Sequence, residues 1–189
     1  MTNLEDRLAL HQRLADTYFD AYAHHIERGA VIMSKEWKLA PGLLYSSAYF
    51  GVGNPAPVAH LVDDAGNTNE MKVYLAAMPD WRAIDFLGWP SPQGFITRTR
   101  FQGTTKDGRT LSSTLVNFWH TNEVGEITRC DALVNGDEHG PVTEAVTGVR
   151  GPFESYEAYW RALTARLQLY RDTETYPTAA DDLSEHSGA

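Results

Sequence analysis

The sequence predicts an α+β fold in which helices close one side of a strongly curved antiparallel sheet. Two observations support it: a long amphipathic helix opens the chain, and the second half is rich in strands. The strand predicted over residues 110–121 would span about 40 Å if it were straight, and strands twist rather than stay flat. A bent sheet closed by helices forms a cone with a cavity.

The first helix is predicted from apolar and aromatic side chains that recur every three or four residues over residues 3–28. This spacing places them on one stripe, made of Leu4, Leu8, His11, Ala15, Tyr18 and Tyr22. Gly29 is the expected end of the helix, since glycine readily adopts the left-handed conformation found there. A short helical turn is expected over residues 32–37, ended before Pro41.

Two further helices are predicted from the residues at their start and from the spacing of their apolar residues. Asn67 with Glu70 three residues later resembles a capping box, which predicts a helix that continues to Met78. Pro152 suits the first turn of a final helix, whose apolar face is Phe153, Tyr156, Trp160, Leu163, Leu167 and Tyr170. Residues 136–151, just before this helix, are expected to be irregular.

The strands are predicted from runs rich in aromatic and apolar residues. Four such runs occur, over residues 43–50, 95–101, 110–121 and 126–134. Turn sequences over residues 106–109 and 122–125 join the last three runs, which therefore form an antiparallel meander. Residues 51–57 hold two glycines and two prolines and are a predicted loop.

The composition is that of a globular protein. The 189 residues include 42% hydrophobic, 11% aromatic and 22% charged residues, which suits one domain. Residues 172–189 contain acidic side chains but no lysine or arginine, so we divide the chain into a domain (1–171) and an acidic, disordered tail (172–189). The net charge of −9 argues against a nucleic-acid partner, because phosphate contacts need clustered cations.

Cysteine content and hydropathy exclude further classes. The lone cysteine, Cys130, allows no intramolecular disulfide and no Cys-based zinc site. The first residues lack the basic region and apolar run of a signal peptide, and no apolar stretch approaches the ~18 residues of a membrane span. No metal or nucleotide motif occurs. We therefore expect a cytoplasmic protein that uses no metal, no cofactor and no membrane partner.

Four stretches of the chain resemble the SnoaL-like branch of the NTF2-like superfamily. They run from Leu14 to Tyr18 with Tyr22, from Met78 to Trp81, from Phe101 to Arg109, and from Asn117 to Asp131. This superfamily contains polyketide cyclases, ketosteroid isomerase, scytalone dehydratase and limonene epoxide hydrolase. The resemblance implies an NTF2-like cone closed by the long N-terminal helix. It also implies a homodimer formed through the outer face of the meander, where Phe118 lies, although the fold hosts many reactions and plain binding modules.

Tyr18 and Tyr22 lie one helical turn apart and should point the same way. At the mouth of an apolar pocket, their hydroxyls would donate hydrogen bonds to an oxyanion or to a leaving hydroxyl. The alternative is a pair of core aromatics with satisfied hydroxyls. The resemblance favours a role, because members of the superfamily carry a pocket tyrosine on this helix.

Asp85 and His120 are alternative acid–base candidates. Asp85 lies in the apolar stretch 81–89, which should disfavour its charged form and raise its pKa. The resemblance places it near a catalytic histidine of dehydratase-like members, and the alternative is an ion pair with Arg82. His120 titrates nearest neutrality. However, strand alternation makes it face away from Asn117, so the alternative is an outer-face histidine.

The remaining candidates would bind or orient the substrate. Asn117 resembles the strand asparagine of dehydratase-like members and would orient a substrate oxygen. Arg98 and Arg100 share a strand face; pointing inward they would suit an anionic ligand, and pointing outward they would pair with acids. Asp131 is either a catalytic base in the pocket or a salt-bridge partner. The other possible substrate contacts are Lys38, Tyr45, Tyr49 and Trp81. For Tyr49 the alternative is ordinary packing.

The candidate side chains can polarise a carbonyl or hydroxyl group and transfer protons. They are tyrosine, aspartate, arginine, histidine and asparagine. We therefore expect a cofactor-independent lyase that dehydrates a hydroxylated aromatic small molecule or removes formaldehyde from it by a retro-aldol step. Lignin-derived diarylpropanes are one substrate that the resemblance suggests. The alternatives are a SnoaL-type polyketide cyclase or ketosteroid isomerase-like enzyme with a polycyclic substrate, and a non-catalytic module that binds a small ligand.

Overall fold

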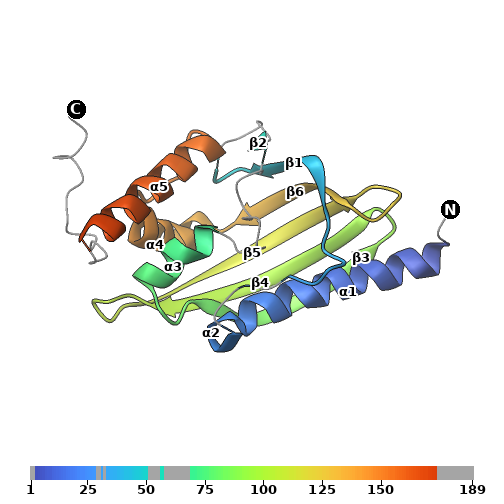
Figure 1. Ribbon diagram of the computed structural model, residues 1–189, viewed down its shortest axis with the longest axis horizontal. Helices are drawn as coiled ribbons and strands as arrows, with labels where there is room; N and C mark the ends of the chain where they lie inside the picture. The colour runs from blue at the N-terminus through green and yellow to red at the C-terminus, as the bar shows by residue number, and fades with distance from the viewer. Residues whose placement is uncertain (1–2, 29–30, 32, 51–55, 58–68, 174–189) are drawn as a thin grey trace.

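The computed structural model describes residues 3–28, 31, 33–50, 56–57 and 69–173. The fold is α+β, as the sequence predicts, with a curved sheet and helices packed against it (Figure 1). The sheet has the strand order β2-β1-β6-β5-β4-β3. Its strands are β1 (Leu39–Ser47), β2 (Ala56–Pro57), β3 (Arg82–Ser91), β4 (Gly94–Thr104), β5 (Thr110–Thr121) and β6 (Ile127–Val134).

The long strands β3 to β6 form an antiparallel meander, and the three predicted strands of the second half are confirmed as β4, β5 and β6. The turn between β4 and β5 has Gly108 at φ +86°, a conformation that favours glycine. Strand β3 is not among the strands predicted from the sequence, because Pro90 obscures the strand pattern. A proline is tolerated there since β3 is at the edge of the sheet.

Strand β1 departs from the antiparallel expectation. It runs parallel to β6, with Tyr45 opposite Cys130. A parallel neighbour requires a long crossover connection, which here contains β2, α3 and the strands β3 to β5. The strand predicted over residues 43–50 is present, but it begins at Leu39 and ends at Ser47.

Helix α1 (Leu4–Ala23) packs against β3 and β4 (Figure 1). The side chain of Asn3 caps it by accepting a hydrogen bond of 2.8 Å from the Asp6 N–H. Its buried face carries His11, Leu14, Ala15, Tyr18 and Ala21. The helix predicted over residues 3–28 is divided at His24, after which α2 (His25–Arg28) follows. The expected stop, Gly29, lies outside the described residues.

The other helices gather at the far end of the sheet from the start of α1 (Figure 1). Helix α4 (Gly136–Thr147) packs on β5, while α3 (Asn69–Ala77) and α5 (Tyr156–Thr173) pack against α4. The expectation of irregular structure over residues 136–151 is wrong. Asn135 caps α4, and Gly148 ends it in the left-handed conformation at φ +79°, although Pro141 within it disfavours a helix.

Several expectations fall partly outside the described residues. Residue 32 of the predicted turn over 32–37 lies outside them. In the rest of that segment, the Trp37 N–H donates a hydrogen bond of 3.0 Å to the Ser34 carbonyl oxygen, which marks a turn. Within the predicted loop 51–57, residues 56–57 form β2. The predicted capping residue Asn67 lies outside the described residues, and so do residues 174–189 of the predicted tail. Helix α5 continues to Thr173, two residues past the predicted end of the domain at residue 171. No described helix is long and apolar enough to cross a membrane.

The two faces of the sheet differ. On the inner face, Ser113 and Asn117 of β5 are buried beneath the helices. On the outer face, Leu87 and Leu133 belong to one row across the strands and are about half exposed. Strand alternation alone separates these two sets. Any cavity enclosed by the fold therefore faces the odd-numbered residues of β5.

Candidate functional site

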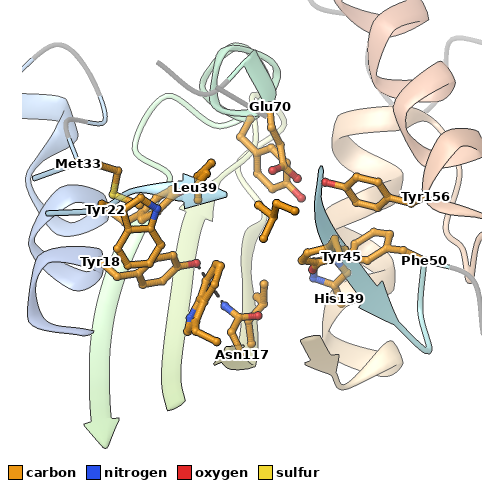
Figure 2. A pocket seen from close by; sticks show the side chains of 15 residues that line it. Tyr18, Tyr22, Met33, Leu39, Tyr45, Phe50, Glu70, Asn117, His139 and Tyr156 are labelled. Atoms are coloured by element: carbon orange, nitrogen blue, oxygen red, sulfur yellow. Dashed lines mark hydrogen bonds between the residues drawn. The ribbon is translucent and has the colours of Figure 1, made fainter. Parts of the chain in front are cut away.

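An aromatic cavity lies between the inner face of the sheet and the helices (Figure 2). Its volume is about 120 Å³, and a second cavity of about 70 Å³ shares Tyr18, Tyr22, Glu70 and His139 with it. Aromatic side chains surround this cavity. They include Tyr18, Tyr22, Tyr45, Tyr74, Trp119 and Tyr156. Rings of this kind present flat apolar faces and a few hydroxyl groups to a ligand.

Tyr18 and Asn117 form one polar wall of the cavity. The Asn117 Nδ2 donates a long hydrogen bond of 3.4 Å to the Tyr18 hydroxyl (Figure 2). The Asn117 Oδ1 has no hydrogen-bond partner within the described ranges of the chain. Burial raises the pKa of Tyr18 well above its usual value. The Tyr18 hydroxyl therefore keeps its proton and can donate it in a hydrogen bond to a ligand oxygen.

Glu70, from the first turn of α3, places a carboxyl group at the cavity. It accepts a hydrogen bond from the Tyr159 hydroxyl, which also lies 3.1 Å from the Tyr74 hydroxyl. Burial raises the pKa of Glu70, and the Tyr159 bond only partly opposes this. Among the lining residues that the structure describes, Glu70 is the one carboxylic acid.

His139, from α4, lines the same cavity and is 2% exposed. Its Nδ1 lies 2.7 Å from the Ser113 Oγ, whereas its Nε2 has no hydrogen-bond partner among the described residues. Burial lowers the pKa of His139 to about 4, so the ring is neutral at neutral pH. Tyr49 and Phe50 pack edge-on against it, with ring centroids at 5.0 and 5.6 Å.

The structure brings four of the predicted site residues to this cavity: Tyr18, Tyr22, Tyr45 and Asn117. Trp81 lines the adjoining cavity. Tyr49 lies behind His139, where its hydroxyl lies 2.8 Å from the Thr143 hydroxyl and donates to the Arg150 carbonyl. Lys38 is exposed. These positions favour packing as the role of Tyr49 and leave Lys38 away from the described lining.

Asp85 lies outside the cavity, on the outer face of the sheet. Its Oδ2 accepts a hydrogen bond of 2.9 Å from Arg98 Nη1, and both side chains are at least one third exposed. Arg100 is exposed on the same strand as Arg98. The expectation of apolar surroundings for Asp85 is therefore wrong, because β3 at the sheet edge turns this side chain towards solvent.

His120 and Asp131 meet each other on the outer face. The His120 Nε2 lies 3.0 Å from Asp131 Oδ2, and Arg129 Nη2 lies 2.7 Å from Asp131 Oδ1. All three side chains are partly exposed. His120 faces away from the buried Asn117, as strand alternation predicts. Asp131 therefore takes the salt-bridge alternative in this structure.

Neither Glu70 nor His139 is among the site residues predicted from the sequence. In the sequence Glu70 resembles only the end of a capping box, and His139 lies in the segment expected to be irregular. Asn135 and Gly148, at the two ends of α4, carry the cap signals that could have revealed this helix. Among the described residues, no three histidine, cysteine, aspartate or glutamate side chains converge as a metal site would require.

No family model matches this chain, and no curated protein matches it. Solved structures do match it. A phenazine biosynthesis-related protein from Pseudomonas aeruginosa has 11% identity and a TM-score of 0.46, over 75% of this chain and 85% of that one. An NTF2-like protein from Burkholderia thailandensis has 14% identity and a TM-score of 0.42, over 71% and 92%.

A third match is a SnoaL-like polyketide cyclase from Agrobacterium tumefaciens. It has 16% identity and a TM-score of 0.38, over 73% of this chain and 95% of that one. These neighbours include NTF2-like and SnoaL-like proteins, the group that the four stretches of sequence resemble.

Proposed function

We propose that this chain is an NTF2-like enzyme that transfers protons on a hydroxylated aromatic small molecule, with its own side chains as the acid and base. One observation carries the proposal: Glu70, a carboxyl group whose pKa is raised by burial, lies in a cavity lined by aromatic rings. A carboxyl group with a raised pKa is a stronger base than an ordinary one and can regain its proton nearer neutrality.

Glu70 and Tyr18 have complementary roles in this proposal. The Glu70 carboxylate removes a proton from the substrate, and the electron pair moves towards an oxygen atom of the conjugated system. The Tyr18 hydroxyl, which keeps its proton because its pKa is raised, donates a hydrogen bond to that oxygen. Asn117 orients the Tyr18 hydroxyl through their hydrogen bond.

We propose a lyase as the reaction class. In a dehydration, Glu70 takes a proton from the carbon next to the hydroxyl-bearing carbon and returns it to the departing hydroxyl, so that the C–O bond breaks and water leaves. In a retro-aldol cleavage, Glu70 takes the proton of a hydroxymethyl group. The C–C bond then breaks, formaldehyde leaves, and Glu70 returns the proton to the carbon that kept the electron pair.

The test begins with thermal-shift screening of three panels: phenolic dimers, steroids and polyketide-like quinones. Compounds that bind are then incubated with the wild-type protein, and the products are analysed by mass spectrometry. We expect a phenolic compound to lose water or formaldehyde. Binding without turnover across the bound set would indicate a ligand-binding module. Isomerisation of a steroid or cyclisation of a quinone would indicate the alternative enzymes.

Glu70→Gln keeps an oxygen acceptor for Tyr159 but removes the acid–base function. We expect kcat to fall by roughly 10²–10⁴, with the Kd for the substrate nearly unchanged. Glu157→Gln makes the same chemical change on an exposed side chain and is the matched control. Asp85→Asn tests the rival acid. Full turnover in Glu70→Gln, or loss in Asp85→Asn instead, would refute the role of Glu70.

A further inference from the structure

The buried pair of Ser113 and His139 has an asymmetric set of hydrogen bonds. Ser113 lies on the inner face of β5 with 0% exposure, and its Oγ is 2.7 Å from His139 Nδ1. No second hydrogen bond of the Ser113 hydroxyl is found among the described residues. On the other side of the ring, the buried His139 Nε2 has no hydrogen-bond partner in the part of the chain that the structure describes. The proton of the neutral imidazole must therefore be assigned to one of these two nitrogens.

The two assignments satisfy different numbers of groups. With the proton on Nδ1, that N–H donates to Ser113, which leaves the serine proton and the Nε2 lone pair both unsatisfied. With the proton on Nε2, the serine hydroxyl donates to Nδ1, and the Nε2–H alone lacks a partner. Because buried donors and acceptors are costly when unpaired, the second assignment is the more stable one. It also leaves the unpaired N–H on a ring that lines the cavity.

We infer that Ser113 positions His139 with its proton on Nε2, so that the cavity contains a hydrogen-bond donor that selects ligands with a carbonyl oxygen. The inference rests on the proposed function, because it names the ligand class for the same cavity. Tyr18 and His139 lie on opposite sides of the cavity, with Asn117 between them (Figure 2). A ligand that uses both donors therefore carries its carbonyl oxygen towards His139 and a second oxygen towards Tyr18.

The tautomer can be measured without any ligand. Long-range ¹H–¹⁵N correlation spectra of uniformly labelled protein at neutral pH distinguish a protonated Nε2 from a protonated Nδ1. We expect the protonated-Nε2 pattern for His139 in the wild-type protein and its loss in Ser113→Ala. Ser112→Ala, the neighbouring serine on the other face of β5, is the matched control and should keep it. A protonated Nδ1 in the wild type, or an unchanged pattern in Ser113→Ala, would overturn the inference.

Ligand selection is measured with a pair of probes that differ at one group. 4-Hydroxybenzophenone and 4-benzylphenol share two rings and a phenol, but only the first has a carbonyl. We expect the ketone to bind the wild type about tenfold more tightly, the ratio that one net hydrogen bond supplies. In His139→Phe, which keeps a flat ring, this ratio should fall to about one. Equal affinities in the wild type would overturn the selection.

The outcomes separate this inference from the proposed reaction. Both measurements use the resting protein, so a lyase that proves inactive leaves the tautomer and the probe ratio standing. Conversely, a protonated Nδ1 would leave the role of Glu70 intact. If neither probe binds the wild type, the selection is overturned, and the tautomer spectrum still tests where the His139 proton lies.

Discussion

Acid should destabilise this protein through protonation of His139, and His139→Gln should remove this part of the acid sensitivity. The folded protein holds the ring neutral, since burial lowers its pKa from 6.5 to about 4. The unfolded chain binds a proton at 6.5, so below that pH it gains a proton that the folded protein resists. The contribution of the neutral ring to stability is therefore complete above pH 6.5 and is lost as the pH falls towards 4.

The magnitude follows from the two pKa values. Each tenfold difference in proton affinity corresponds to about 1.4 kcal/mol. Between pH 7 and pH 4, the His139 contribution to the free energy of unfolding should fall by about 3 kcal/mol. Carboxyl groups also change their protonation in this range, so the effect is isolated by comparison with His139→Gln, which has no titrating ring.

Urea unfolding followed by tryptophan fluorescence at a series of pH values provides the measurement. We expect the wild type to lose about 3 kcal/mol more than His139→Gln between pH 7 and pH 4. His24→Gln, at a side chain that is about half exposed, is the control and should behave like the wild type. The same acid-induced loss in His139→Gln and the wild type would refute the neutral, buried state of this histidine.

Three further predictions concern turnover, assembly and local backbone. Tyr18→Phe should lower kcat by roughly 10²–10³ with little change in substrate Kd, measured by steady-state kinetics; an unchanged kcat would exclude its donor role. Leu133→Glu places a charge on the exposed outer face of the sheet and should convert the homodimer that the sequence resemblance implies into a monomer in sedimentation runs; a monomeric wild type contradicts it. Gly148→Ala should destabilise the fold by about 1 kcal/mol, because φ is +79°; an unchanged urea midpoint contradicts it.

The strands of the meander show how much of the fold local pattern predicts. Strand β5 begins and ends where the sequence analysis expects, at Thr110 and Thr121, because turn residues bound an unbroken run of strand formers. Strand β3 and helix α4 were not predicted. Pro90 disfavours β3 and Pro141 disfavours α4. In the fold, β3 lies at the edge of the sheet and α4 packs against α5, and this tertiary packing outweighs the local preference.

Periodicity and alternation were enough to predict the α+β class, to place Tyr18 on the apolar stripe of the first helix, and to predict that Asn117 and His120 face opposite sides of the sheet, since these depend only on repeats of 3.6 and 2 residues. They did not show that Glu70 and His139, far apart in the chain, line the same cavity. Nor did they show that Asp85, in an apolar run, lies at an edge strand and faces solvent. Burial sets the protonation of a carboxyl or imidazole group, and burial is decided by which elements pack together.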